Sequence, residues 1–209
     1  DIIEAGHLLS QKKLIARTWG NISARISENQ FLITPSGRPY RTLTEHDIVT
    51  VNISDLSYQG DVRPSSEAGV HAELYRLRPD AGAVIHTHQN MASAISVSPD
   101  GLQIDNADYQ ALLGDVVPCT AYGMPGTKKL RTAVKDAAVR YPDSRAFLLP
   151  RHGTVIESAD LDTAFGAAKA LECAAEKKYR HIVKDELPDS QQEKSGPPEK
   201  ARKLCAVIR

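Results

Sequence analysis

The chain has 209 residues, which is enough for one domain with a sizeable buried core. Its 26 lysines and arginines balance its 26 aspartates and glutamates, so no global charge draws it to nucleic acid or to an acidic membrane surface. No apolar run approaches the roughly 20 residues of a membrane span. The three cysteines form no C-x-x-C pair, and their odd number favours a reducing compartment. We therefore expect a cytoplasmic protein that binds neither nucleic acid nor a membrane.

Helical and strand patterns alternate along the first part of the chain. Apolar spacing and β-branched runs predict, in order, a helix over residues 1–16, strands over residues 30–34 and 48–52, and a helix over residues 68–77. Gly20 and Asn21 both tolerate positive φ and suit a turn whose amides point into a pocket. One of the serines at positions 65 and 66 is expected to cap the last of these helices.

The second part of the chain continues the alternation. It predicts, in order, a strand over residues 83–88, a short helix over 90–97, a strand at 116–117, a helix over 126–141, strands over 146–149 and 154–156, and a long helix to about residue 183. The pattern of residues 104–114 does not distinguish a helix from a strand. After residue 183 the chain is charged and rich in proline, which favours a loosely held tail. We expect one domain over residues 1–183 and a charged C-terminal tail over residues 184–209.

Two histidines at the end of the predicted strand 83–88 are the strongest chemical signal in the chain. Side chains at positions i and i+2 of a strand share a face, so His86 and His88 can point at one ion while Thr87 faces away. Two neutral imidazoles on a rigid strand suit zinc, and a catalytic zinc site needs a third protein ligand and an open position. A third histidine, His152, lies at the corner of a predicted tight strand–turn–strand.

Two loops have the composition of an anion site. Ser36 and Gly37 can offer a hydroxyl and unobstructed backbone N–H groups to an anion. Ser65 and Ser66 precede a predicted helix, and the first turn of a helix attracts phosphate through its free N–H groups and its dipole.

Short motifs connect these signals in a fixed order along the chain. They are Gly20-Asn21, Thr34-Pro35-Ser36-Gly37, Pro64-Ser65-Ser66-Glu67, His86-Thr87-His88 and Arg151-His152-Gly153. Together they resemble the class II aldolase/adducin family over about residues 1–183. The resemblance implies an α/β fold with three layers, α/β/α, around a central, mostly antiparallel sheet. It also implies a homotetramer with active sites at subunit interfaces.

The resemblance assigns roles to individual residues. It implies one Zn²⁺ per subunit, held by His86, His88 and His152. Glu67 matches the catalytic acid/base of the family. The phosphate of a sugar phosphate substrate would be bound by a set of small and polar residues, namely Gly20, Asn21, Ser36, Gly37, Ser65 and Ser66.

The type of reaction depends on the segment around Asp108 and Tyr109. Aldolases of the family bring a tyrosine from the adjacent subunit to the aldehyde oxygen, which makes Tyr109 a candidate catalytic residue. The epimerases carry an acidic residue followed by a tyrosine nearby, and this chain has both residue types. His71 lies one helical turn after Glu67 and could reach the site, although a packing role is the simpler interpretation.

The sequence therefore favours a zinc-dependent class II aldolase, an aldehyde-lyase. It would reversibly cleave a ketose 1-phosphate, similar to fuculose or deoxyribulose phosphate, into dihydroxyacetone phosphate and an aldehyde. The enzymatic alternatives are a methylthioribulose-1-phosphate dehydratase and a pentulose-5-phosphate 4-epimerase. The non-enzyme alternative is a binding module similar to the adducin head. Such a module would be expected to have lost its metal ligands, whereas this chain keeps the three histidines and Glu67.

Overall fold

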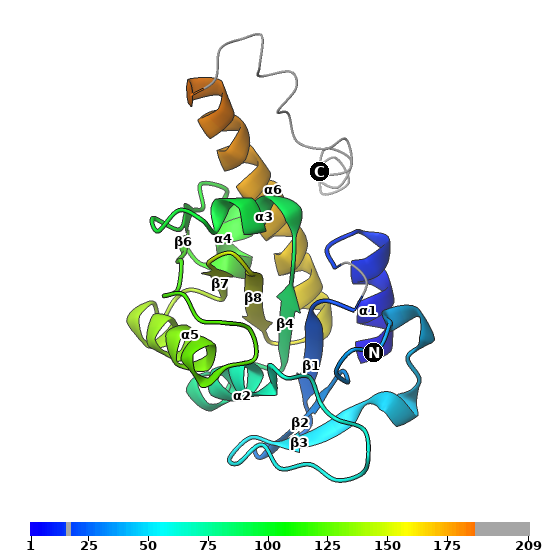
Figure 1. The fold of residues 1–209 in the computed structure, drawn as a ribbon. Helices are drawn as coiled ribbons and strands as arrows, with labels where there is room; N and C mark the ends of the chain where they lie inside the picture. The colour runs from blue at the N-terminus through cyan, green and yellow to red at the C-terminus, as the bar shows by residue number, and fades with distance from the viewer. Residues whose placement is uncertain (16–17, 187–209) are drawn as a thin grey trace.

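A six-stranded antiparallel sheet forms the centre of the computed structural model, which describes residues 1–15 and 18–186. Its strands lie in the spatial order β3 (Val49–Asn52), β2 (Gln30–Ile33), β1 (Asn21–Arg25), β4 (Ala83–Thr87), β8 (Gly153–Ser158) and β7 (Ala146–Leu149). Every neighbouring pair in this sheet is antiparallel. The mostly antiparallel sheet that the resemblance implied is therefore confirmed, although β1 was not among the predicted strands. Strand β4, which contains His86 and is followed by His88, is one of the two central strands (Figure 1).

Helices cover both faces of this sheet. They are α1 (Ile2–Gln11), α2 (Ala68–Leu77), α3 (Asn90–Ile95), α4 (Ala107–Leu113), α5 (Lys128–Arg140) and α6 (Leu161–Glu186), with short 3₁₀ turns at Tyr40–Thr42 and Glu45–Asp47. Helix α6 packs on β4 and β8, and α1, α3 and α4 lie in its layer, whereas α2 and α5 pack together on the opposite face (Figure 1). This is the three-layer α/β/α arrangement that the resemblance implied.

Strand alternation divides the core into two apolar clusters. In β4, Ala83 and Ile85 belong to the cluster under α6, and Val84 belongs to the cluster under α2. Because side chains alternate along a strand, the next two residues follow the same rule. His86 therefore continues the α2 face, and Thr87 continues the α6 face.

Several predicted boundaries were wrong by a few residues. The first helix ends at Gln11 rather than at residue 16, because Lys13 adopts a left-handed conformation (φ 59°). Lysine rarely adopts this conformation, so the sequence does not indicate the end of the helix. The helix predicted over 126–141 begins at Lys128, since Gly126 has a φ of +73° and Thr127 caps the helix by accepting the N–H of Leu130.

Other elements differ in kind or in length. The ambiguous segment 104–114 contains a helix, α4, and the short strand β5 (Leu102–Gln103), which was not predicted, pairs with β6 (Val116–Val117). Helix α3 ends at Ile95 rather than at residue 97. Helix α6 continues to Glu186, past the predicted end of the domain. The remainder of the predicted tail lies outside the described residues.

The cap of α2 is also not a serine. Glu67 is the N-cap residue, and it makes no side-chain capping bond of its own. Ser65 stabilises the turn instead, because its Oγ accepts the N–H of Glu67 at 3.3 Å. The Glu67 carboxylate is therefore not used at the helix end.

Within residues 1–15 and 18–186, no helix is both long and apolar enough to span a membrane.

Candidate functional site

Three histidines converge at one end of the sheet. His86 and His88 leave β4 on the same face, as the strand alternation predicted. His152 comes from the tight turn between β7 and β8, where Arg151 has a positive φ of 58°. One ligand atom from each histidine lies within 4.8 Å of the other two, so the group could hold a metal ion. The predicted meeting of these three residues is therefore present in the fold.

The hydrogen bonds of the histidines fit a metal ion. The Nδ1 of His86 lies 2.8 Å from the backbone carbonyl of Thr154, and a carbonyl can only accept, so Nδ1 carries a proton and donates this hydrogen bond. The Nε2 of His86 lies 2.9 Å from the Nε2 of His88. The Nδ1 of His152 is buried and has no hydrogen-bond partner among residues 1–15 and 18–186. Converging nitrogens with unused bonding capacity are the donor set that zinc and similar ions prefer.

The protonation of these rings also suits metal binding, which requires neutral imidazole. Burial, together with the charge of neighbouring histidines, lowers the pKa of His88 to about 3. The same causes lower the pKa of His152 to about 4. Both rings are therefore neutral at neutral pH.

Glu67 lies against this histidine group. Its Oε2 is 3.1 Å from the Nε2 of His86, and its Oε1 is 3.5 Å from the Nε2 of His152. Asn21 donates to Oε2 and the backbone N–H of Gly126 donates to Oε1, both at 3.3 Å. Burial alone would raise the pKa of Glu67, but the neighbouring histidines and the Asn21 hydrogen bond together bring it below its ordinary value. The carboxylate is thus ionised and within reach of whatever the histidines hold.

The two predicted phosphate loops lie side by side next to Glu67. The N–H of Ser36 donates to the carbonyl of Arg63, and the N–H of Ser65 donates to the carbonyl of Thr34. Ser36 and Ser66 are exposed, whereas Ser65 is buried. These contacts join the two loops, and the bond from the N–H of Glu67 to the Oγ of Ser65 connects them to the carboxylate beside the histidines. Their role in binding phosphate stays a prediction.

The remaining predicted phosphate residues form the turn that leads into β1. Gly20 has a φ of +92°, and a Cβ at this position would lie 2.7 Å from the carbonyl oxygen of His86. Only glycine allows the turn to pack this closely on β4. Asn21 pairs with His86 across the sheet and is buried, with one amide N–H still available beyond its bond to Glu67.

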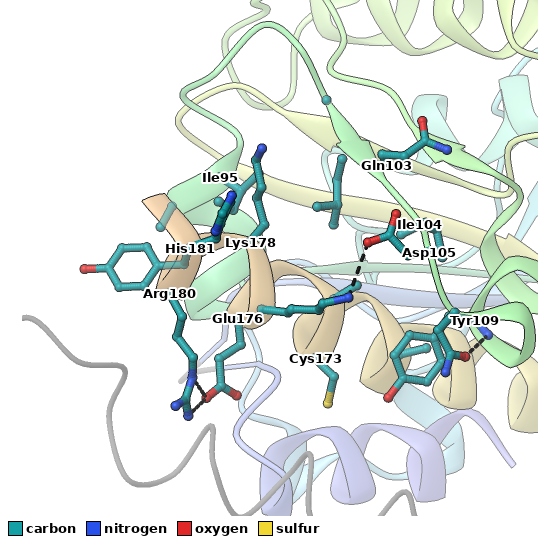
Figure 2. A pocket seen from close by; sticks show the side chains of 18 of the residues that line it. Ile95, Gln103, Ile104, Asp105, Tyr109, Cys173, Glu176, Lys178, Arg180 and His181 are labelled. Carbon is teal, nitrogen blue, oxygen red and sulfur yellow. Dashed lines mark hydrogen bonds and ion pairs between the residues drawn. The ribbon is translucent and has the colours of Figure 1, made fainter. Parts of the chain in front are cut away.

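Tyr109 does not join the histidine group within one chain. It lies on α4, in the layer of α6, and lines a groove of about 1630 Å³ together with residues of α6 (Figure 2). Asp108 is exposed at the same groove. The histidines face the other helical layer. A catalytic role of Tyr109 therefore needs a second subunit and stays a prediction.

Sequence reasoning missed three contributors to the site. The N–H of Gly126 binds Glu67, although the sequence placed this residue inside a helix. The carbonyl of Thr154 orients His86, and a backbone group leaves no signal in the sequence. Trp19, which is 52% exposed, lies with its ring centre 5.9 Å from that of His88. The position of Trp19 directly before the predicted Gly20-Asn21 turn was the one signal available in the sequence.

Comparison with known proteins places this arrangement in a family. Residues 1–179 match the family described as Class II Aldolase and Adducin N-terminal domain. The chain is 34% identical to an L-fuculose phosphate aldolase of Escherichia coli strain K12 over 159 residues, which are 76% of this chain and 72% of the relative. It is 32% identical to a 5-deoxy-D-ribulose 1-phosphate aldolase of Bacillus thuringiensis over 86% of this chain and 83% of the relative.

Solved structures agree with the sequence relatives. An L-fuculose 1-phosphate aldolase superposes with a TM-score of 0.80 at 30% identity, covering 98% of this chain and 94% of that one. The L-fuculose-1-phosphate aldolase of Thermus thermophilus gives a TM-score of 0.73 at 29% identity, covering 90% of this chain and 95% of that one. These relatives are enzymes rather than binding modules. The chain belongs to the class II aldolase and adducin family, as its motifs indicated.

Proposed function

We propose that this chain is a zinc-dependent aldolase that reversibly cleaves a ketose 1-phosphate into dihydroxyacetone phosphate and an aldehyde. The observation that carries the proposal is the Glu67 carboxylate, which lies against two of the three converging histidines. A metal site without a proton-transferring group would only bind. A carboxylate beside the ligands supplies the acid/base that cleavage of a carbon–carbon bond requires.

The residues divide the chemical work between them. A divalent ion held by His86, His88 and His152 would supply Lewis-acid polarisation of the ketose oxygens. Glu67 would return a proton to the carbon atom that loses its bond to the aldehyde, and would remove that proton in the direction of synthesis.

The phosphate residues Gly20, Asn21, Ser36, Gly37, Ser65 and Ser66 would hold the substrate at its phosphate end. Binding energy from this remote group positions the reacting carbons near Glu67. The relatives support this substrate class, because they are named as aldolases of fuculose phosphate and deoxyribulose phosphate. We place the enzyme in the cytoplasm, where its sugar phosphates would occur.

The assembly belongs to the same proposal. We propose a homotetramer in which Tyr109 of one subunit completes the site of the next, because the fold keeps Tyr109 away from its own histidines. The tyrosine would exchange a proton with the aldehyde oxygen. Each subunit would bind one Zn²⁺.

The test is an incubation of the purified protein with a panel of ketose phosphates. We expect release of dihydroxyacetone phosphate, its loss after treatment with a chelator, and its recovery on addition of Zn²⁺. Loss of water from methylthioribulose 1-phosphate would favour the dehydratase, and formation of an epimer from a pentulose 5-phosphate would favour the epimerase. A protein without stoichiometric metal and without any of the three activities would be a binding module of the adducin-head type.

A further inference from the structure

A chain of buried hydrogen bonds leads away from Glu67 into the core between β1 and α2. The Oδ1 of Asn21 lies 2.5 Å from the Nε2 of His71, and the Nδ1 of His71 lies 2.6 Å from the hydroxyl of Ser23. The hydroxyl of Tyr75 lies 2.8 Å from that of Ser23. All members are at most 7% exposed. The chain thus links the carboxylate beside the histidines to a tyrosine in the α2 core.

The repeat lengths of a helix and a strand explain how this chain of bonds is built. Glu67, His71 and Tyr75 follow one another at intervals of four residues from the N-cap of α2 into the helix, and each interval corresponds to a rise of about 6.0 Å. Asn21 and Ser23 are two residues apart on one face of β1, which corresponds to about 6.6 Å. Because the two spacings nearly match, side chains from the helix and the strand alternate along the same line.

The direction of every bond follows from the orientation of the Asn21 amide. Its nitrogen donates to the Oε2 of Glu67 at 3.3 Å, and its oxygen, which can only accept, faces the Nε2 of His71. His71 must then carry its proton on Nε2, and its Nδ1 accepts the hydroxyl proton of Ser23. The hydroxyl of Tyr75 donates in turn to Ser23. Burial lowers the pKa of His71 to about 3, with His86 adding to the effect, so the ring is the neutral one that this order requires.

We propose that Tyr75, Ser23, His71 and Asn21 form a polarised relay that fixes the orientation of the Glu67 carboxylate, with His71 and Ser23 as positioning residues for catalysis. The inference rests on the proposed role of Glu67. If His71 carried its proton on Nδ1, the Asn21 amide would turn over and present its oxygen to Glu67. Two acceptors would then face each other, and the carboxylate would leave its position beside the histidines.

The first test reads the proton position directly and needs no substrate. Imidazole nitrogens with and without a proton differ in ¹⁵N chemical shift, so NMR of the zinc-loaded protein labelled in its histidines reports the state of His71. We expect a neutral His71 ring with its proton on Nε2 at pH 7. A ring that is protonated on Nδ1, or on both nitrogens, would overturn the relay.

The second test measures whether the relay serves catalysis. Ser23→Ala removes the central hydroxyl, and we expect kcat to fall about tenfold while KM and zinc content stay unchanged. Ser144→Ala is the matched control, since Ser144 is also buried and donates one hydrogen bond to the carbonyl of Val116, but lies outside the relay. Equal kcat values in the two variants would disprove the positioning role. If Ser23→Ala fails to fold, Tyr75→Phe is judged by the same criterion.

The two tests separate this inference from the proposed function. If the wild-type protein cleaved no ketose phosphate, the function would fail, and the ¹⁵N measurement would still decide the polarity of the relay. If the wild type cleaves its substrate and Ser23→Ala cleaves it equally fast, only the relay is wrong.

Discussion

Two buried polar networks lie on opposite faces of the sheet at the end of β4. On the α6 face, Thr87 and Thr154 both donate to the Oε1 of Gln89, and the Nε2 of Gln89 donates to the carbonyl of Ala168. This network is closed, because each of these groups has its partner inside the protein. On the α2 face, the Nε2 atoms of His86 and His88 lie 2.9 Å apart, and the Nδ1 of His152 has no hydrogen-bond partner in the described part of the chain.

The comparison distinguishes polar groups that stabilise the fold from polar groups that can bind a ligand. Buried polar groups are nearly always paired, so a closed network can fix a core and leaves nothing for a ligand. The histidine network is incomplete until a proton or a cation joins it. The same strand therefore carries a structural network on one face and a candidate site on the other. The two networks differ in whether their polar atoms still lack hydrogen-bond partners, and not in burial or in the number of residues.

The largest expected effect comes from His88→Ala. The change removes one of the converging nitrogens, so the protein should lose its stoichiometric metal, and ketose phosphate cleavage should fall to background. Thr87→Val is the control, because it alters the neighbouring residue on the closed face and should keep the metal. Metal analysis by mass spectrometry and a cleavage assay measure the two quantities. A His88→Ala protein that lacks metal and is fully active would contradict the site.

The second effect concerns Glu67→Gln. Gln keeps the shape of the side chain but cannot take up a proton, so turnover should fall at least about a hundredfold, as expected for a general acid/base. Zinc content and substrate affinity should change little, because the histidines and the phosphate loops remain. Steady-state kinetics and metal analysis check this. Retention of more than about a tenth of wild-type turnover would show that Glu67 is not the acid/base of the reaction.

The third effect tests assembly by mixing two inactive chains. If each site combines Glu67 of one subunit with Tyr109 of the next, hybrids of Glu67→Gln and Tyr109→Phe chains contain intact sites. Random pairing in equal amounts makes about a quarter of the sites intact, so co-expression should restore about a quarter of wild-type activity. Glu67→Gln co-expressed with the double variant is the control and should stay inactive. A fully active monomer would rule out the shared site.

Most helices and strands, and the shared face of His86 and His88, could be predicted from the sequence because their determinants are local: a spacing of two residues gives a common face wherever a strand forms. The layer arrangement and the place of His152 as a third ligand were implied by the family resemblance. The surroundings of Glu67 could not be predicted in this way. Gly126 is far from it in sequence and acts through its backbone, and the interleaving of α2 with β1 depends on how two separate elements pack.

The fourth effect is the pH dependence of folding stability that a buried, neutral His71 causes. The closed network causes no such dependence, because its central side chain, Gln89, does not titrate. The pKa of His71 is about 3 in the fold against an ordinary value of 6.5, so the unfolded chain binds more protons between these pH values, and folding stability falls as the pH decreases. At pH 5 the loss is about 2 kcal/mol, from about 1.36 kcal/mol for each pKa unit. The stability advantage of the wild type over His71→Gln should shrink by this amount between pH 7 and pH 5, measured by urea unfolding of both metal-free proteins. An advantage that stays constant would contradict a neutral, buried His71.

The smallest effect is expected from Thr154→Val in the closed network. Valine keeps the β-branched shape that suits β8, and the backbone carbonyl that orients His86 is unchanged. The variant loses one buried hydroxyl, while Thr87 still donates to Gln89, so the free energy of unfolding should decrease by about 1 kcal/mol. Metal content and turnover should equal those of the wild type, because nothing on the histidine face has lost a partner. Loss of metal from this variant would mean that the closed face also positions the ligands, and that the two networks act as one.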